Sequence, residues 1–305
     1  MSMATREAYG QALVELMKNE KIVVLDADLA KATKTIDFKK ACPERFFDMG
    51  ISEQDMIGTA AGFATSGKIP FASTFAIFAA GRAFEQIRNS VCYPKLNVKI
   101  AATHAGITVG EDGASHQAVE DISLMRSIPN MVVLNPADDI EAKQAVFAAA
   151  EYYGPVYIRL GRASTPTIHD ENYKFKIGKG EVLKEGSDVA IIATGIMVAK
   201  ALEAAEKLKV EGINATVVNI STIKPIDKDL IIKVAKEAGK VVTVEEHSVI
   251  GGLGSAVCEV LSQELPTRVK LIGLNDTFGQ SGNANELLEY YKLTVENIVE
   301  TVKSF

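Results

Sequence analysis

The chain has 305 residues, 47% of them hydrophobic and 24% charged, which favours two globular domains of ordinary size. Its net charge is −6 at pH 7, and no Lys/Arg cluster is interleaved with aromatic residues, so we expect no nucleic-acid partner. No uncharged apolar run approaches the roughly 18 residues that span a membrane, so we expect no membrane association. Cys42, Cys92 and Cys258 are far apart, which predicts neither a disulfide framework nor a zinc site and favours a cytoplasmic location.

Short β-branched runs alternate with helical patterns along the whole chain, which predicts an α/β fold of mostly parallel sheets flanked by helices. In the first half the predicted strands are 22–26, 97–103, 131–134 and 156–160, and the predicted helices are 53–65, 83–91, 117–126 and 137–153. These elements predict a first domain over residues 1–163. The polar, irregular stretch that follows, with Pro166 and two glycines, predicts a linker over residues 164–183.

A second α/β domain is predicted over residues 184–305. Its predicted strands are 188–194, 215–219, 240–245 and 269–273, and its predicted helices are 198–208, 228–238 and 254–265. The glycines between Gly251 and Gly254 follow a strand and open a helix, as in some anion sites. Because the Gly-x-Gly-x-x-Gly order of nucleotide-binding proteins is missing, we expect a packing loop here and assign no role to His247.

Side chains that could carry chemistry gather where the predicted strands of the first half end. In open parallel sheets, ligands bind beyond the carboxyl ends of the strands. The polar residues that follow a strand, or lie in the glycine-rich loop after it, are Asp26, Asp28, His104, Glu111, Asp112 and His116. The sequence therefore predicts a binding site at this edge of the sheet.

Glu53 admits two interpretations. Ser52 as N-cap, with Asp55 three residues later, forms a capping box in which Glu53 merely complements the positive end of a helix. Alternatively, Gly-Ile-Ser-Glu at 50–53 resembles the transketolase-superfamily segment in which a glutamate contacts the aminopyrimidine ring of thiamine diphosphate. Further stretches resemble the same family in the same order: Pro70–Arg88, Ala102–Gln117, Asn135–Asp139 and Arg159–Arg162. Essentially the whole chain resembles the pyrimidine-binding and C-terminal domains of transketolase.

The resemblance implies a set of contacts to thiamine diphosphate. Glu53 would activate the cofactor through its pyrimidine ring, a role that requires a buried carboxyl group. Phe75 and Phe78 would line the pyrimidine, although both also fit plain core positions at helical spacing. Asp28 would lie beside the thiazolium, and Ile51 would contact the cofactor next to Glu53. The third member of the cradle is left open between Phe84 and Ile77.

The resemblance also implies a site for sugar phosphates. His104 and His116 would bind the hydroxyls or phosphate of the donor sugar and assist proton transfer, because imidazole titrates near working pH. Asp112 would read the hydroxyl beside the ketose carbonyl. Arg162 would clamp the phosphate with its planar guanidinium, with Arg159 as its competitor.

The chain lacks the Gly-Asp-Gly segment, followed by Asn, that binds Mg²⁺ and the diphosphate in full-length members of the superfamily. We therefore expect no metal site in this chain. A separate N-terminal transketolase subunit would hold the diphosphate and Mg²⁺, within a dimer of heterodimers. The expected activity is transfer of a two-carbon ketol unit from a ketose phosphate to an aldose phosphate. The alternatives are the β subunit of a 2-oxoacid dehydrogenase, a deoxyxylulose-phosphate synthase-like enzyme, and a non-catalytic partner subunit.

Overall fold

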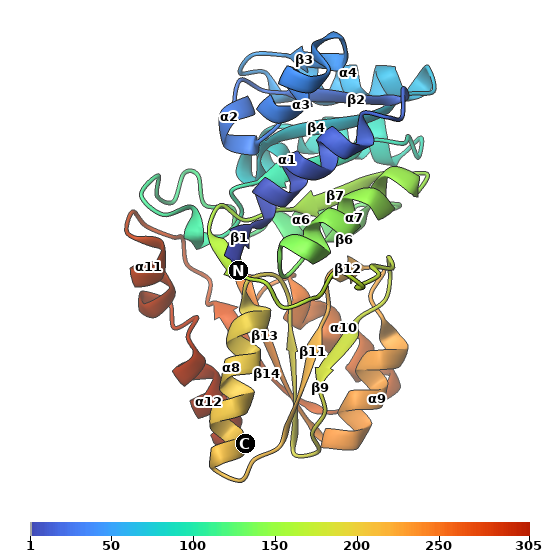
Figure 1. Cartoon of the computed structure of the whole chain (residues 1–305). Helices are drawn as coiled ribbons and strands as arrows, with labels where there is room; N and C mark the ends of the chain where they lie inside the picture. The colour runs from blue at the N-terminus through green and yellow to red at the C-terminus, as the bar shows by residue number, and fades with distance from the viewer. Residues whose placement is uncertain (1) are drawn as a thin grey trace.

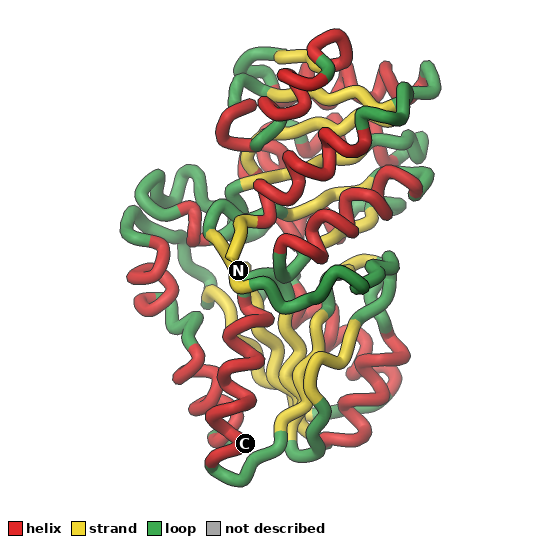
Figure 2. The backbone as a smooth tube through the Cα atoms, viewed as in Figure 1, coloured by secondary structure: helices red, strands yellow, loops and turns green. Residues whose placement is uncertain are grey.

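Two twisted sheets, one above the other in Figure 1, organise the computed structural model, which describes residues 2–305. Within these residues the larger sheet has the strand order β12-β6-β7-β5-β4-β2-β3, and the smaller sheet has the order β14-β13-β10-β11-β9. All neighbouring strands are parallel except β12 and β9, which pair antiparallel at one edge of each sheet. Figure 2 shows helices on both faces of the sheets. The predicted α/β class is confirmed.

The elements of the first half run from the N-terminus to the end of β8. The strands are β1 (Ser2–Ala4), β2 (Ile22–Asp26), β3 (Phe46–Asp48), β4 (Ile69–Phe75), β5 (Lys99–Thr103), β6 (Val132–Leu134), β7 (Val156–Arg159) and β8 (Ser164–Pro166). The α-helices are α1 (Thr5–Leu16), α2 (Ala30–Thr33), α3 (Ile36–Ala41), α4 (Glu53–Thr65), α5 (Phe84–Gln86), α6 (Asp121–Ser127) and α7 (Asp139–Glu151). Wider π-helical turns, Phe78–Arg82 and Ile87–Cys92, flank α5.

The second half contributes the smaller sheet and one strand of the larger one. The strands are β9 (Glu181–Lys184), β10 (Val189–Ala193), β11 (Ala215–Asn219), β12 (Thr222–Lys224), β13 (Lys240–Ser248) and β14 (Arg268–Leu274). The helices are α8 (Met197–Val210), α9 (Lys228–Ala238), α10 (Leu253–Glu264), α11 (Ala284–Tyr290) and α12 (Val295–Lys303). Every residue of β10 and β11 is buried, as expected for parallel strands covered on both faces.

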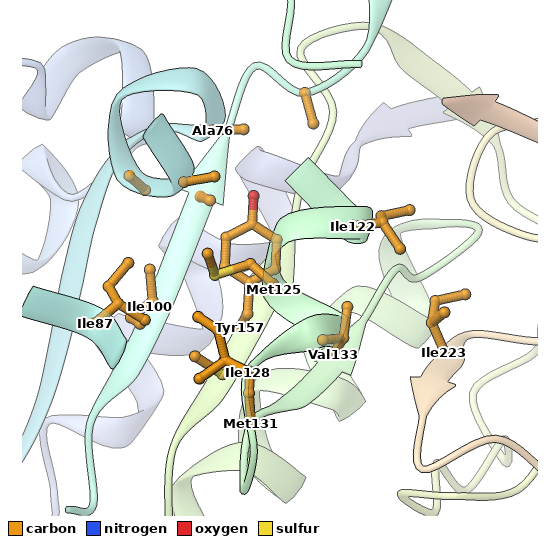
Figure 3. Packing of buried hydrophobic residues seen from close by; sticks show 14 of the residues in the cluster. Ala76, Ile87, Ile100, Ile122, Met125, Ile128, Met131, Val133, Tyr157 and Ile223 are labelled. Atoms are coloured by element: carbon orange, nitrogen blue, oxygen red, sulfur yellow. The ribbon is translucent and has the colours of Figure 1, made fainter. Parts of the chain in front are cut away.

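Strand β12 crosses from the second half to the sheet of the first. Thr222 pairs with Leu134 of β6, and the Lys224 ammonium donates to the carbonyl oxygens of Arg126 and Ile128. Figure 3 shows Ile223 beside Val133, at the margin of the packed cluster around Tyr157. The hydrophobic core is therefore continuous between the two halves, which the local sequence pattern did not predict.

The segment predicted as a linker, 164–183, is partly structured. Its first residues form β8, which pairs antiparallel with β1 so that Ala4 lies opposite Ser164. Its last residues begin β9, the edge strand of the smaller sheet. In residues 2–305, no helix combines the length and the apolar character that crossing a membrane requires.

Candidate active site

Glu53 is the first residue of helix α4, and its side chain is only 4% exposed. The Ser52 hydroxyl makes no capping hydrogen bond within residues 2–305, so the capping-box interpretation is not supported. Instead, Nη1 of Arg82 lies 3.2 Å from one Glu53 carboxylate oxygen and 3.4 Å from the other. The Arg82 side chain is 51% exposed, so a buried acid is matched here by a cation that can move into solvent.

An open hollow of about 580 Å³ lies over the Glu53 carboxylate. It is lined by Ile51, Ser52, Glu53, Gln54 and Arg82. Ile51 is 77% exposed at its rim. The hollow gives a ligand access to an otherwise buried acid.

Two aromatic rings continue the site from Arg82. Phe75 ends strand β4, Phe78 lies in the turn that follows, and their ring centroids are 5.8 Å apart with the planes inclined by 15°. The Arg82 guanidinium carbon lies 4.0 Å from the centroid of Phe78, which is a cation–π contact. Glu53, Arg82, Phe78 and Phe75 therefore form an unbroken row.

Both predicted histidines pack against this row. The His104 ring stacks on Phe75 with centroids 3.9 Å apart, and the His116 ring meets Phe78 edge-on at 5.3 Å. The structure thus brings together Glu53, Phe75, Phe78, His104 and His116, although Glu53 and His116 are 63 positions apart in the sequence.

His104 is neutral in this environment. Its Nε2 lies 3.3 Å from Nη1 of Arg6, and its Nδ1 lies 2.9 Å from the Thr103 hydroxyl. Because arginine can only donate, Nε2 accepts and Nδ1 carries the proton. Burial, then the charges of Arg6 and Arg162 and the nearby His116, lower the His104 pKa to about 3. The sequence-based expectation of an imidazole that titrates near pH 7 does not hold for His104.

Arg162 and Asp112 lie together on the exposed side of the glycine-rich loop. Arg162 donates to the carbonyl oxygen of Val109, and its Nη1 lies 3.5 Å from the Glu111 carboxylate and 3.8 Å from that of Asp112. Its side chain is 38% exposed, so this guanidinium can reach a ligand.

Arg159, the predicted competitor of Arg162, has a different place. It is 4% exposed, and its Nε donates to Asp121 at 2.9 Å. Its Nη2 donates to the carbonyl oxygens of Ala118 and Glu246. These contacts make Arg159 a buried structural tie and leave Arg162 as the accessible arginine.

Asp28 is exposed beyond β2 and is not part of the aromatic row. Its backbone N–H donates to the Asp48 carboxylate at 3.1 Å, and its φ of 63° is in the left-handed region. Two residues earlier, Asp26 is fully buried and accepts hydrogen bonds from Leu29 and two threonine hydroxyls. Burial raises the Asp26 pKa to about 6.

Arg6 and Arg82 are site residues that sequence reasoning did not single out. Arg6 belongs to helix α1, and besides its contact with His104 it donates to the carbonyl oxygen of Ala32 at 2.9 Å. Its Nε is buried and has no hydrogen-bond partner among residues 2–305. Nothing local in the sequence links positions 6 and 104. Across the described part of the chain, no group of three or more His, Cys, Asp or Glu side chains is placed to hold a metal ion.

Comparison with known families accounts for this arrangement. The model of the transketolase pyrimidine-binding domain matches residues 1–167, more than half of the chain. The chain belongs to the transketolase family. The model of the transketolase C-terminal domain matches residues 178–298, so the chain carries the pyrimidine-binding and C-terminal domains together. A pyrimidine-binding domain of transketolase implies the use of thiamine diphosphate.

Similar transketolase chains of the same extent are known. The "Putative transketolase C-terminal section" of Methanocaldococcus jannaschii is 57% identical over 301 residues, which cover 97% of this chain and 94% of that one. The "6-deoxy-6-sulfo-D-fructose transketolase subunit SqwH" of Clostridium sp. is 44% identical, covering 96% and 92%. A solved structure described as "Split gene transketolase, inactive beta4 tetramer" is 60% identical, with a TM-score of 0.92, covering 100% and 98%. The chain thus corresponds to the C-terminal subunit of a split transketolase-family enzyme, and relatives named as subunits imply a partner subunit.

Proposed function

We propose that this chain is the C-terminal subunit of a two-subunit transketolase. The complex would transfer a two-carbon ketol unit from a ketose phosphate to an aldose phosphate, with thiamine diphosphate bound between the subunits. The observation that carries the proposal is the buried carboxylate of Glu53, which faces an open hollow at one end of a row of aromatic rings and histidines. Other buried acids of the chain, such as Asp121 and Glu245, are bonded to groups of the protein, whereas the Glu53 carboxylate also lines an open hollow.

The residues present fit the pyrimidine end of thiamine diphosphate. Phe75 and Phe78 offer near-parallel ring faces for a flat heterocycle, and Glu53 offers a carboxylate to a polar ring edge. Ile51 at the rim and Asp28 beyond β2 are proposed as further cofactor contacts. When bound, thiamine diphosphate supplies a carbanion centre that accepts and releases the two-carbon unit. The contribution of Glu53 is to hold and exchange a proton at the pyrimidine.

The sugar phosphate is assigned to the other end of the row. Arg162 is accessible, and Arg6 has a buried Nε without a partner among residues 2–305, so both have donors for phosphate oxygens. Neutral His104 can hydrogen-bond a hydroxyl without a charge of its own, and His116 is proposed to take the proton from the C3 hydroxyl. Asp112 is proposed to accept a hydrogen bond from the hydroxyl beside the ketose carbonyl. Arginine binds either anion, so it is the two histidines beside Arg162 that favour a sugar phosphate over a 2-oxoacid, because a sugar has the hydroxyls that they can bind.

The diphosphate and Mg²⁺ are assigned to the N-terminal subunit, because this sequence lacks the Gly-Asp-Gly segment. A similar chain is described as inactive in a beta4 tetramer, which is consistent with a need for the partner. The active assembly is proposed to be a dimer of heterodimers.

The experiment is to mix the chain with candidate N-terminal subunits, thiamine diphosphate and Mg²⁺, and to assay xylulose 5-phosphate with ribose 5-phosphate. Turnover is expected only in the mixture. Glu53→Gln should assemble but lose at least about 100-fold in kcat. Asp55→Asn is the matched control, because Asp55 is exposed in the same helical turn and the charge change is the same. Turnover by the chain alone, or normal turnover by assembled Glu53→Gln, would refute the proposal.

A further inference from the structure

The glycine-rich loop that carries Asp112 and His116 is built on the C-terminal domain. Ile107, in the short helical turn Ile107–Val109 of this loop, belongs to the same apolar cluster as Ile191 and Leu287 of that domain. In Figure 1 the blue-green loop lies next to helix α11. The positions of Asp112 and His116, the two side chains proposed to bind the sugar, therefore depend on packing against the C-terminal domain.

Glu246 of β13 makes a direct contact with this loop. Its side chain is buried, and its Oε1 accepts a hydrogen bond of 2.7 Å from the backbone N–H of Thr108. Gly106 has a φ of +78°, and a Cβ atom at this position would lie 2.3 Å from the Glu246 carboxylate. The loop can take this path because position 106 has no side chain and the Thr108 N–H has an acceptor.

Gln117 and the segment after β14 hold the rest of the loop. The Gln117 amide nitrogen donates to the carbonyl oxygens of Ile107 and Gly110, both at 3.2 Å, and to that of Gln280 at 2.9 Å. The Ser281 hydroxyl donates to the carbonyl oxygen of Glu111, next to Asp112. The loop is thus tied to the C-terminal domain on both sides of Asp112.

The backbone of Glu246 is itself fixed relative to the first sheet. Arg159 donates to the Glu246 carbonyl oxygen at 3.0 Å while its Nε pairs with Asp121. Arg159 is the last residue of β7, which belongs to the same sheet as Phe75. Its hydrogen bond therefore fixes the Glu246 backbone relative to that sheet. A carboxylate held in this way can define where the loop lies relative to the aromatic row.

We propose that Glu246 is a positioning residue for substrate, which acts through Thr108 to hold the loop 104–116 with Asp112 and His116 facing the donor sugar. The proposal rests on the proposed function, because it takes these two side chains as substrate contacts. It gives the C-terminal domain a part in setting the affinity for the donor.

Two variants of Glu246 test this role in the reconstituted two-subunit enzyme. Glu246→Leu removes the acceptor at similar volume, whereas Glu246→Gln keeps an oxygen for the Thr108 N–H. We expect Glu246→Leu to raise the donor KM about 10-fold or more, with a smaller change in kcat and unchanged affinity for thiamine diphosphate. Glu246→Gln should restore most of the donor affinity.

Glu245→Leu is the matched control. Glu245 is equally buried and adjacent in sequence, but its carboxylate accepts from the N–H groups of Leu253 and Gly254 at the start of α10. This variant should lose stability without a selective rise in the donor KM. An equal rise in both leucine variants would overturn the positioning role of Glu246.

Hydrogen exchange of the chain alone gives a readout that needs no turnover. Peptides over residues 104–117 should exchange faster in Glu246→Leu than in the wild type or Glu245→Leu. If Glu246→Leu does not fold, Thr108→Pro removes the same hydrogen bond from its donor side and should produce the same faster exchange. Unchanged exchange in the folded variant rejects the proposal, whereas absence of ketol transfer by the wild-type complex rejects the proposed function instead.

Discussion

The imidazole of His104 stacks on the phenyl ring of Phe75, with their planes inclined by 22°. The contact follows from strand register, since Phe75 at the end of β4 pairs with Thr103 at the end of the parallel strand β5. The residue that follows β5 is His104, whose φ of 58° turns the chain out of the sheet. The register of these two strands thus places a proposed cofactor contact beside a proposed substrate contact.

The aromatic wall can be tested at Phe75. Phe75→Leu keeps an apolar side chain but removes the ring face, so affinity of the reconstituted complex for thiamine diphosphate should fall about 2- to 10-fold. Calorimetric titration of the complex measures the change. Phe71→Leu is the control, because Phe71 lies on the same strand but is fully buried in a different core cluster. Impaired cofactor binding in Phe71→Leu alone would contradict the assignment.

Substitution of Arg162 should affect substrate binding, whereas substitution of Arg159 should affect stability. Arg162→Gln should raise the KM for a phosphorylated donor roughly 10-fold or more and leave the melting temperature close to that of the wild type. Arg159→Gln should instead destabilise the chain by about 3–5 kcal/mol, because it leaves the buried carboxylate of Asp121 without its charged partner. Steady-state kinetics and denaturant titration of both variants decide the matter. The reverse pattern would make Arg159 the phosphate ligand.

The ion pair of Glu53 and Arg82 should be measurable in the isolated chain. Arg82→Ala should cost about 1 kcal/mol of unfolding free energy, a modest value because the arginine is half exposed. In a Glu53→Gln background the same substitution should cost less, and the difference is the coupling energy of the pair. Arg88→Ala, in the same segment and exposed, should show no such coupling. If the effects of Arg82→Ala and Glu53→Gln on unfolding free energy are additive, the ion pair is not formed.

The buried contacts of His169 lead us to expect a loss of stability at alkaline pH. Its Nδ1 lies 2.9 Å from the Asp138 carboxylate and its Nε2 lies 3.1 Å from that of Glu181. Burial opposes the charge of the imidazolium, but the bond to Asp138 and the charges of Glu141, Asp138 and Glu181 outweigh it and raise the His169 pKa to about 9. Because this folded-state pKa is above the unfolded value of 6.5, the stabilisation is complete below about pH 6.5 and is lost as pH rises through 9.

The expected loss is about 2 kcal/mol between pH 6.5 and 9.5, measured as unfolding free energy in denaturant. His169→Gln cannot titrate, so it should show a flatter dependence over this range. Parallel curves for the wild type and the variant would show that His169 is not held as a cation.

Local pattern was sufficient for some elements near the site but not for β4, which carries Phe75 and was not among the predicted strands. Helix 53–65 and strand 22–26 have the predicted bounds, because each is a continuous apolar or amphipathic run with clear breaks at its ends. The predicted helix 83–91 is instead wound partly as π-helix around a short α-helical turn. Periodicity reports which face is buried, not the winding of the backbone.

Long-range contacts were beyond the reach of that pattern. Strand β12 has three residues, too few for a periodic signal, and pairs with a strand almost ninety positions earlier. The same holds for Arg6 beside His104, and for Arg159, whose burial depends on Asp121 across the domain. The family resemblance predicted which residues matter near Glu53, while their mutual distances came only from the assembled sheet.

Strand β12 comes from the second half of the chain but pairs with the sheet of the first half. This pairing limits where such an enzyme can be divided into separate polypeptides. A break between residues 164 and 183 would strip β6 of its outer neighbour and leave its N–H and C=O groups open to another chain. It would also uncover the apolar surface now covered by Ile223. Fragments made in this way are expected to associate edge to edge. The two domains should therefore be produced as one polypeptide.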